Sequence, residues 1–384
     1  MIVLSQFAGT SLWFVGNAVL PELKQSLHLS QYAVSLVTTA VMLGFIAGTL
    51  VFAFFSLADR YSPVKLFLFS SVLGAISNMS VAWIAKDSSS LFAVRVITGF
   101  FMAGIYPVGM KIAADWYQDG LGKALGYLVG ALVLGTAFPH LLRNRDFALP
   151  WKSVLYCTSA FAVAGGLLMY LLVGDGPHRK KAGRFQWNAL AEIFGSKQWR
   201  QSAFGYFGHM WELYTFWGFV PLILGLYAEK NHIVINIPLL SFLIIGCGSI
   251  SCIAGGYLSL KAGSARVAAA ALFISGLCCF ISPLAYQLPL LVFLFILFAW
   301  GITVVPDSPQ FSALVANYAP QHLRGTALTI YNSIGFSIST ISLLVTDRVF
   351  HSQGLFSKEN TMLLLGIGAI IGLPGIVRLI RSRR

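Results

Sequence analysis

Long apolar runs, separated by short clusters of charged and turn residues, constrain this chain more than any other feature. Each run is close to the roughly 20 residues that a helix needs to cross a bilayer. Only 10% of the residues are charged, against about 25% in a typical soluble protein. These features predict an all-α membrane protein and exclude a soluble enzyme, a nucleic-acid-binding protein and a disordered scaffold. We place twelve transmembrane helices at residues 2–20, 32–57, 66–85, 91–112, 123–142, 152–173, 200–226, 235–259, 266–285, 288–310, 325–346 and 361–378.

The Lys and Arg residues segregate to one side of the predicted helices. Alternating sides along the twelve spans puts sixteen of them on one face and eight on the other. Because positive charge collects on the cytoplasmic side of membrane proteins, both termini are predicted to be cytoplasmic, in a multi-pass protein of the cytoplasmic (inner) membrane. The net charge of +13 therefore reports topology rather than a nucleic-acid partner.

The longest polar stretch, residues 174–198, divides the chain into two predicted halves of six helices each, 1–173 and 199–384. This stretch is predicted to be a cytoplasmic linker with a short amphipathic helix around 187–194. The halves also repeat each other. The loop SLADRYSPVK (56–65) matches GYLSLKAGSAR (256–266) at a shift of 201 residues, and GKAL (122–125) matches GTAL (325–328) at a shift of 203. Two matches at nearly one shift indicate a duplication.

The loop after the second predicted span carries a recognisable motif. In the major facilitator superfamily this loop reads G-x-L-a-D-R-x-G-R-[KR], and the chain keeps Leu57, Ala58, Asp59, Arg60 and a displaced Lys65. It departs from the motif at Phe55, Ser62 and Pro63. The second copy keeps Gly256, Leu258, Lys261 and Gly263, with Leu260 in place of the Asp. The segment RVITGF (95–100) is similar to the superfamily motif R-x-x-x-G of the fourth span.

Over essentially its whole length the chain thus resembles a major facilitator superfamily transporter. The resemblance implies two six-helix halves, alternating access to a substrate site between them and, usually, a monomer. Three segments, at 106–117, 130–143 and 208–217, resemble bacterial transporters of the nitrate, nitrite and cyanate type. This second resemblance places a small anion first among the candidate substrates.

Glu212 is the first candidate for a functional residue, because a charge inside hydrocarbon costs about 2.5–3.5 kcal/mol on insertion scales. It lies in the middle of the seventh predicted span, with His209 three residues earlier on the same helical face. An acid and an imidazole one turn apart can share or pass a proton. The alternative is a polar clamp between helices, with no role in transport.

Two further charged residues lie in predicted spans. Asp307 stands between Pro306 and Pro309 in the tenth span, where the broken helix suits a substrate or proton site. Capping of a helix, or an ion pair with Arg324, explains it equally well. Arg95 opens the fourth span near the outer side, where it faces an aqueous cavity or extends to the headgroups.

Several charged residues are predicted to form a cytoplasmic gate. The superfamily uses the loop between spans two and three to hold the halves together, which implicates Asp59, Arg60 and Lys65, with Lys261 in the second copy. Lys111 and Asp115 form an i,i+4 pair at the cytoplasmic end of the fourth span, and Arg324 lies at the start of the eleventh. On the outer side, His140 and Arg143 either attract an anion or anchor the helix in the interface.

The combined prediction is a secondary active transporter that moves a small solute by alternating access, with a small anion and protons as the first choice. Its alternative is proton-coupled efflux of amphipathic or cationic compounds, which the aromatic seventh span and Glu212 would suit. The chain has no phosphate-binding loop, nucleophile elbow or metal-ligand spacing, so we expect no enzyme activity, cofactor or metal. A membrane receptor or scaffold and a lipid-modifying enzyme are less consistent with the distribution of charges.

Overall fold

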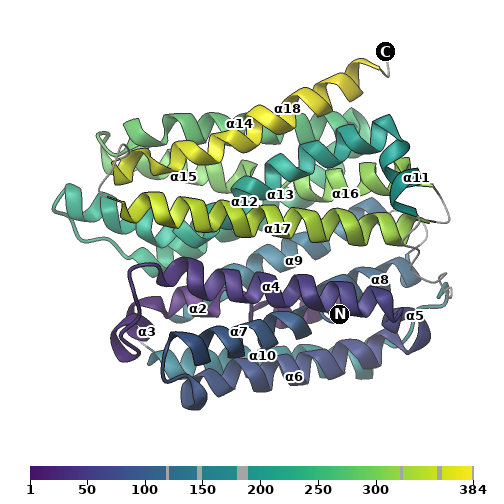
Figure 1. The fold of residues 1–384 in the computed structure, drawn as a ribbon, viewed down its shortest axis with the longest axis horizontal. Helices are drawn as coiled ribbons and strands as arrows, with labels where there is room; N and C mark the ends of the chain where they lie inside the picture. Colours follow the sequence, from purple (N-terminus) through teal and green to yellow (C-terminus); the bar gives the residue numbers. More distant parts are fainter. Residues whose placement is uncertain (118–120, 145–148, 180–188, 321–322, 353–356, 383–384) are drawn as a thin grey trace. The chain divides into compact units, whose positions relative to one another are not determined.

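The computed structural model describes residues 1–117, 121–144, 149–179, 189–320, 323–352 and 357–382 (Figure 1). Within these ranges the chain is helical and has no strand. Ten helices are long and apolar enough to cross a membrane, and they coincide with ten of the twelve predicted spans. The all-α fold class is thus confirmed, whereas the count of twelve stays a prediction.

The other two predicted spans have different structures. The first, residues 2–20, is broken into the short helices α1 (Ile2–Thr10) and α2 (Val15–Ala18), with α3 (Leu20–Ser26) after them. The seventh lies within α12 (Lys197–Lys230), which has ample length but is less apolar than the ten.

The chain forms two compact units, of which unit 1 comprises residues 1–182 and 234–246. Within unit 1, α4, α7, α6 and α10 pack in that order, and α1 packs on α9 and α10 (Figure 1). The remaining elements of unit 1 are α4 (Ala33–Phe54), α5 (Leu57–Arg60), α6 (Pro63–Ile84), α7 (Ser88–Met102), α8 (Tyr106–Trp116), α9 (Leu121–Leu142), α10 (Trp151–Leu168) and the π-helical turn η1 (Met169–Val173).

Unit 2 comprises residues 183–233 and 247–384. Its long helix α12 packs against α18, α17 and α16. The helix α13 (Ile237–Ala262) is divided between the units: its residues up to 246 belong to unit 1 and the rest to unit 2. The two halves predicted from the sequence are instead separated by the linker, and they stay a prediction. The other elements are α11 (Ala189–Gly195), α13 (Ile237–Ala262), α14 (Ser264–Ala285), α15 (Leu290–Thr303), α16 (Asp307–Tyr318), α17 (Arg324–His351), the 3-10 helix η3 (Lys358–Leu365) and α18 (Gly366–Arg381).

The helix boundaries repeat with the same shift of 201 residues as the loop motif. Helix α6 spans 63–84 and α14 spans 264–285, so both ends match. The fourth span breaks between α7, which ends at Met102, and α8, which begins at Tyr106; the tenth breaks between Thr303 and Asp307. Interrupted helices at corresponding positions of two repeats are a pointer to a transport site.

Local sequence explains where several helices begin. Ser62 accepts a hydrogen bond from the Lys65 amide and precedes Pro63, a residue suited to the first turn. Asp87 and Ser90 form a capping box at the start of α7. The hydrogen bonds that the Ser90 amide and hydroxyl donate to Asp87 hold the pKa of this carboxyl, which lies between two spans, below its usual value.

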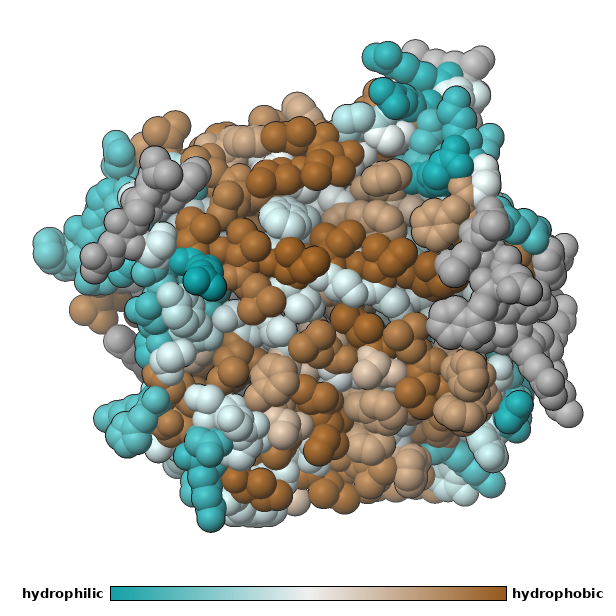
Figure 2. All heavy atoms as spheres, viewed as in Figure 1, coloured by the Kyte–Doolittle hydropathy of each residue, from teal (hydrophilic) through white to brown (hydrophobic). Residues whose placement is uncertain are grey.

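Apolar side chains cover the middle of the helices on the face in view, and hydrophilic ones gather near the helix ends (Figure 2). Exposed hydrophobic residues on α6 include Phe69, Ile76 and Trp83. An exposed apolar surface of this kind is unfavourable in water and suits contact with lipid.

Small residues allow α4 and α7 to approach each other closely. A Cβ atom at Gly99 would overlap the backbone oxygen of Val41, and one at Gly44 would overlap that of Val96. Both obstacles are backbone atoms, which cannot turn away as a side chain would. The packing of these helices therefore depends on glycine at both positions.

We expect Gly99→Ala to destabilise the protein by at least about 1–3 kcal/mol, because the extra methyl group forces the two helices apart. Gly325→Ala is a matched control: a Cβ atom there meets nothing within 4 Å, so helix propensity makes it neutral or slightly stabilising. Thermal melting of both variants in detergent measures the difference. Equal melting temperatures would contradict the packing argument.

Candidate functional site

Glu212 of α12 is buried in unit 2, with 1% of its surface exposed. Its carboxyl oxygens accept hydrogen bonds from Trp300 Nε1 at 2.6 Å, Ser275 Oγ at 3.0 Å and Cys279 Sγ at 3.4 Å. Ser275 and Cys279 come from α14 and Trp300 from α15. Glu212 therefore links three helices, and its hydrogen bonds offset part of the cost of burying a carboxyl group.

His209 lies against Asp307, whereas Glu212 has its partners on α14 and α15; the expected proton sharing between His209 and Glu212 stays a prediction. The Nδ1 atom of His209 lies 2.9 Å from Oδ1 of Asp307, and both side chains are 1% exposed. Asp307 is the first residue of α16, directly after the break in the tenth span. The break turns the start of α16 towards α12, which no periodicity along either helix could indicate.

The other expected partner of Asp307 was Arg324. Arg324 begins α17, but its side chain lies outside the part of the chain that the structure describes. The imidazole of His209 also stacks against Tyr206, with ring centroids 5.8 Å apart, and lies near Phe311. The pair thus sits in a largely aromatic environment.

Arg95 is buried in unit 1 and neither faces solvent nor extends to the headgroups. Its guanidinium donates to the carbonyl oxygens of Trp13 at 2.7 Å and Leu12 at 3.3 Å, and to Asn78 Oδ1 at 3.0 Å. The two carbonyl groups lie in the break between α1, which ends at Thr10, and α2, which begins at Val15. Arg95 therefore supplies hydrogen-bond donors to the backbone carbonyl groups at the break in the first span. Its Nε atom has no hydrogen-bond partner among the described residues.

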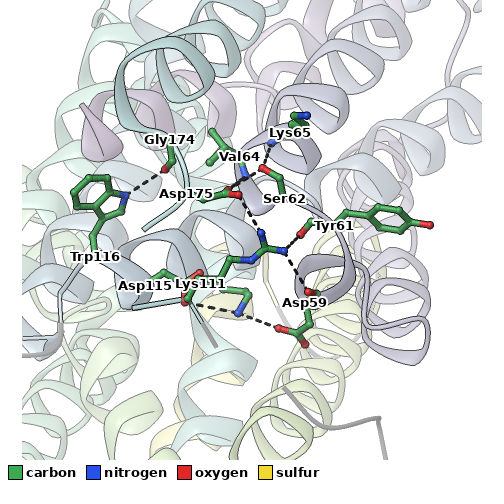
Figure 3. Close-up of polar contacts among 11 residues, drawn as sticks. Asp59, Tyr61, Ser62, Val64, Lys65, Lys111, Asp115, Trp116, Gly174 and Asp175 are labelled. Carbon is green, nitrogen blue, oxygen red and sulfur yellow. Dashed lines mark hydrogen bonds and ion pairs between the residues drawn. The ribbon is translucent and has the colours of Figure 1, made fainter. Parts of the chain in front are cut away.

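A second group of charges lies at the end of unit 1 where α5, α8 and the segment after η1 meet (Figure 3). Lys111 Nζ lies 2.9 Å from Asp59 and 3.7 Å from Asp115, so the predicted i,i+4 pair of Lys111 and Asp115 is confirmed. Arg60 and Lys65 in unit 1, and Lys261 in unit 2, have exposed side chains. No group of three or more His, Cys, Asp and Glu residues in the described ranges could hold a metal ion.

Comparison with known proteins identifies the fold. The family model of the Major Facilitator Superfamily matches residues 2–343. The chain belongs to this superfamily. It is thus a multi-pass membrane protein with a transporter fold. The nitrate, nitrite and cyanate resemblance finds no support in these comparisons, and no curated protein matches the chain.

Two solved structures share the superfamily fold with this chain. The human organic anion transporter MFSD10 (TETRAN) has a TM-score of 0.73 at 16% identity, and 98% of each chain is covered. A bacterial homologue of the human lysosomal transporter Spinster, in an inward-facing and unoccupied conformation, has a TM-score of 0.72 at 13% identity, covering 99% of this chain and 96% of the other. At such low identity the likeness concerns the fold alone.

Sequence reasoning missed two residues of this second group of charges, Asp175 and Arg179. Asp175 accepts hydrogen bonds from Ser62 Oγ at 2.8 Å and the Val64 amide, and pairs with Arg179 at 3.1 Å. Arg179 also donates to the backbone oxygens of Tyr61, at 2.6 Å, and Asp59. The start of the linker is thereby attached to the superfamily's loop between spans two and three (Figure 3). The sequence signal that could have identified them is their spacing, because Asp175 precedes Arg179 by four residues.

We expect Asp59→Asn to slow transport without removing substrate affinity, because its ion pair with Lys111 at this wet surface contributes about 1 kcal/mol or less. Lys86→Gln removes an exposed charge outside the predicted gate and serves as the control. Transport rates in proteoliposomes and ligand-induced thermal shifts measure the two properties separately. An unchanged rate at normal protein levels would rule out a role of Asp59 in the gate.

Proposed function

We propose that this protein is a secondary active transporter that couples the movement of a small solute to protons by alternating access. The observation that carries the proposal is the set of buried titratable groups on the seventh and tenth spans, Glu212, His209 and Asp307. A charge inside the hydrocarbon region is costly, so ionisable groups kept there usually serve the transport cycle. The tenth span is also one of the two interrupted at matching positions.

A small anion is the first substrate class of this proposal. Arg95 supports it as a buried cation beside the break in the first span, with its Nε atom unpartnered within the described ranges. Broken helices of this kind supply the binding sites of many transporters. The fold-level likeness to an organic anion transporter is compatible with this choice.

An amphipathic or cationic compound is the second candidate, and a specific observation favours it. Each cation on which the anion hypothesis relies is engaged by the chain itself: Lys111 by Asp59, Arg143 by Glu22, and Arg95 by two carbonyl groups. Unit 2 meanwhile buries two carboxyl groups beside aromatic rings, which suits a positively charged ligand.

The proposed arrangement in the cell follows from the charge distribution. The protein lies in the cytoplasmic membrane as a monomer, with both termini and the linker 174–198 in the cytoplasm between the six-helix halves 1–173 and 199–384. The excess of Lys and Arg on one side supports this topology. The charged group around Asp59 and Lys111 then belongs to the cytoplasmic gate.

A thermal-shift screen of the purified protein against small anions, organic acids, sugars and amphipathic cations selects the substrate, because a ligand of the folded state raises the melting temperature. The selected compound is then offered to proteoliposomes with an imposed proton gradient. We expect accumulation against the compound's own gradient, and its loss when a protonophore collapses the proton gradient. Accumulation that survives the protonophore would reject proton coupling. Stabilisation by cations alone would put the second substrate class first.

A further inference from the structure

The interior of unit 2 holds more buried acids than buried bases. Glu212 and Asp307 are buried, as is Asp347, which has its own partner His351 at 3.2 Å. Among the described residues of unit 2 no Lys or Arg is buried; Arg95, the buried Arg of the described chain, belongs to unit 1. Within the described interior of unit 2, His209 is therefore the basic group that lies beside these acids and can offset their charge.

Protonation is the direct way to reduce this charge. With Glu212 and Asp307 ionised and His209 neutral, the cluster carries two uncompensated negative charges, each costing several kcal/mol in a low-dielectric interior. One proton on Glu212 and one on the imidazole of His209 make the cluster neutral overall. The proton on His209 leaves an imidazolium beside the carboxylate of Asp307, so that the positive and negative charges of this buried pair compensate each other.

The geometry at Glu212 accommodates both of its protonation states. Ser275 Oγ lies 3.0 Å from Glu212 Oε2 and 3.3 Å from the carbonyl oxygen of Leu272. When Glu212 is ionised, the hydroxyl donates to the carboxylate. When Glu212 is protonated, its own O–H donates to Ser275, whose hydroxyl turns to Leu272. No other group has to move.

The geometry at His209 and Asp307 likewise accommodates a proton. The 2.9 Å contact between Nδ1 and Oδ1 suits both the neutral imidazole with a proton on Nδ1 and the imidazolium, because Nδ1 carries a proton in each of these states. The proton that distinguishes the two states enters at Nε2, which has no hydrogen-bond partner in the described part of the chain. In the part of the chain that the structure describes, Glu212 and this pair share no hydrogen-bonding group, but the negative charges of the two carboxylates repel each other.

We propose that unit 2 binds two protons at separate sites, one on Glu212 and one on the His209–Asp307 pair. The two sites titrate as a coupled system because their charges interact. The use of these protons in transport rests on the proposed function, whereas their binding does not. The other titratable groups that face the sites are Cys252 of α13, Cys278 and Cys279 of α14, Tyr206 of α12 and, stacked on Tyr206, Tyr331 of α17.

Potentiometric difference titration of the detergent-purified protein counts the protons. Across the pH range in which the folded protein is stable, Glu212→Gln and Asp307→Asn should each bind about one proton fewer than the wild type, and the double variant about two fewer. Asp307→Glu should retain the count, and so should Ser312→Ala, which alters α16 without removing a titratable group. An unchanged count in Asp307→Asn, or the loss of both protons in Glu212→Gln alone, would overturn the proposal.

Infrared difference spectra of the wild type over the same pH range give a readout that does not depend on the folding of a variant. We expect a carboxylic-acid C=O band from Glu212 together with imidazolium bands from the pair. The absence of either signal would also overturn the proposal. If both protons are found but uphill transport is independent of Glu212, the proposed function fails and the two-site proposal stands.

Discussion

The Glu212→Gln variant is expected to lose uphill, proton-driven transport while retaining exchange of substrate across the membrane. Gln is close to Glu in shape, and its amide can still accept the hydrogen bond of Trp300 and donate to Ser275, so the links from α12 to α14 and α15 persist. It cannot release a proton. A transporter that is permanently in the protonated-like state can move substrate down a gradient but cannot use the proton gradient to accumulate it.

The two modes are separated in proteoliposomes, by counterflow of labelled substrate for exchange and by an imposed proton gradient for accumulation. Glu359→Gln is the matched control, because it makes the same chemical change at an exposed ion pair, with Lys230, outside the apolar core. That variant should retain both activities. Loss of both modes in Glu212→Gln, or of neither, would remove Glu212 from the coupling mechanism.

Arg95→Ala is expected to destabilise the protein by at least about 3 kcal/mol, because it leaves three buried acceptors without their donor. The acceptors are the carbonyl oxygens of Leu12 and Trp13 and the side-chain oxygen of Asn78. Arg95 is 1% exposed, so these acceptors have no contact with bulk water that could replace the guanidinium. Arg95→Lys should be intermediate, since one ammonium cannot reproduce the planar fork of donors.

Thermal melting and the yield of folded protein report this effect. Arg266→Ala, at an exposed position at the start of α14, is the control and should change stability by a few tenths of a kcal/mol. A normal melting temperature combined with loss of a ligand-induced shift would assign Arg95 to substrate binding instead. That outcome would favour the small anion over the cationic substrate.

Hydropathy predicted the ten apolar spans well, because the thickness of the hydrocarbon core alone requires runs of about 20 apolar residues. The duplication was likewise visible, and the shift of 201 residues recurs in the ends of α6 and α14. The first span was predicted as continuous because Ser11 to Phe14, the residues at its break, contain no proline or charge. At this break Arg95, from another helix, donates hydrogen bonds to the carbonyl oxygens of Leu12 and Trp13.

The pairing of His209 shows where sequence reasoning ended. His209 and Glu212 lie one turn apart on α12, but this separation along the chain does not decide which side chain faces each of them on the neighbouring helices. The rotation of a helix about its axis is set by packing against its neighbours and not by its hydropathy. Asp307 reaches His209 only because the tenth span breaks directly before it.

The sequence by itself determined that this chain spans a membrane, that it contains a repeat and that charged residues stand at particular depths in its helices, because these properties depend on the order of apolar and charged residues alone. The tertiary structure decided which groups satisfy those charges: Trp300 and Ser275 for Glu212, Asp307 for His209, and the carbonyl groups of a broken helix for Arg95. A buried polar group takes whatever partner helix packing brings within hydrogen-bond distance, and those partners lie on helices remote in the chain.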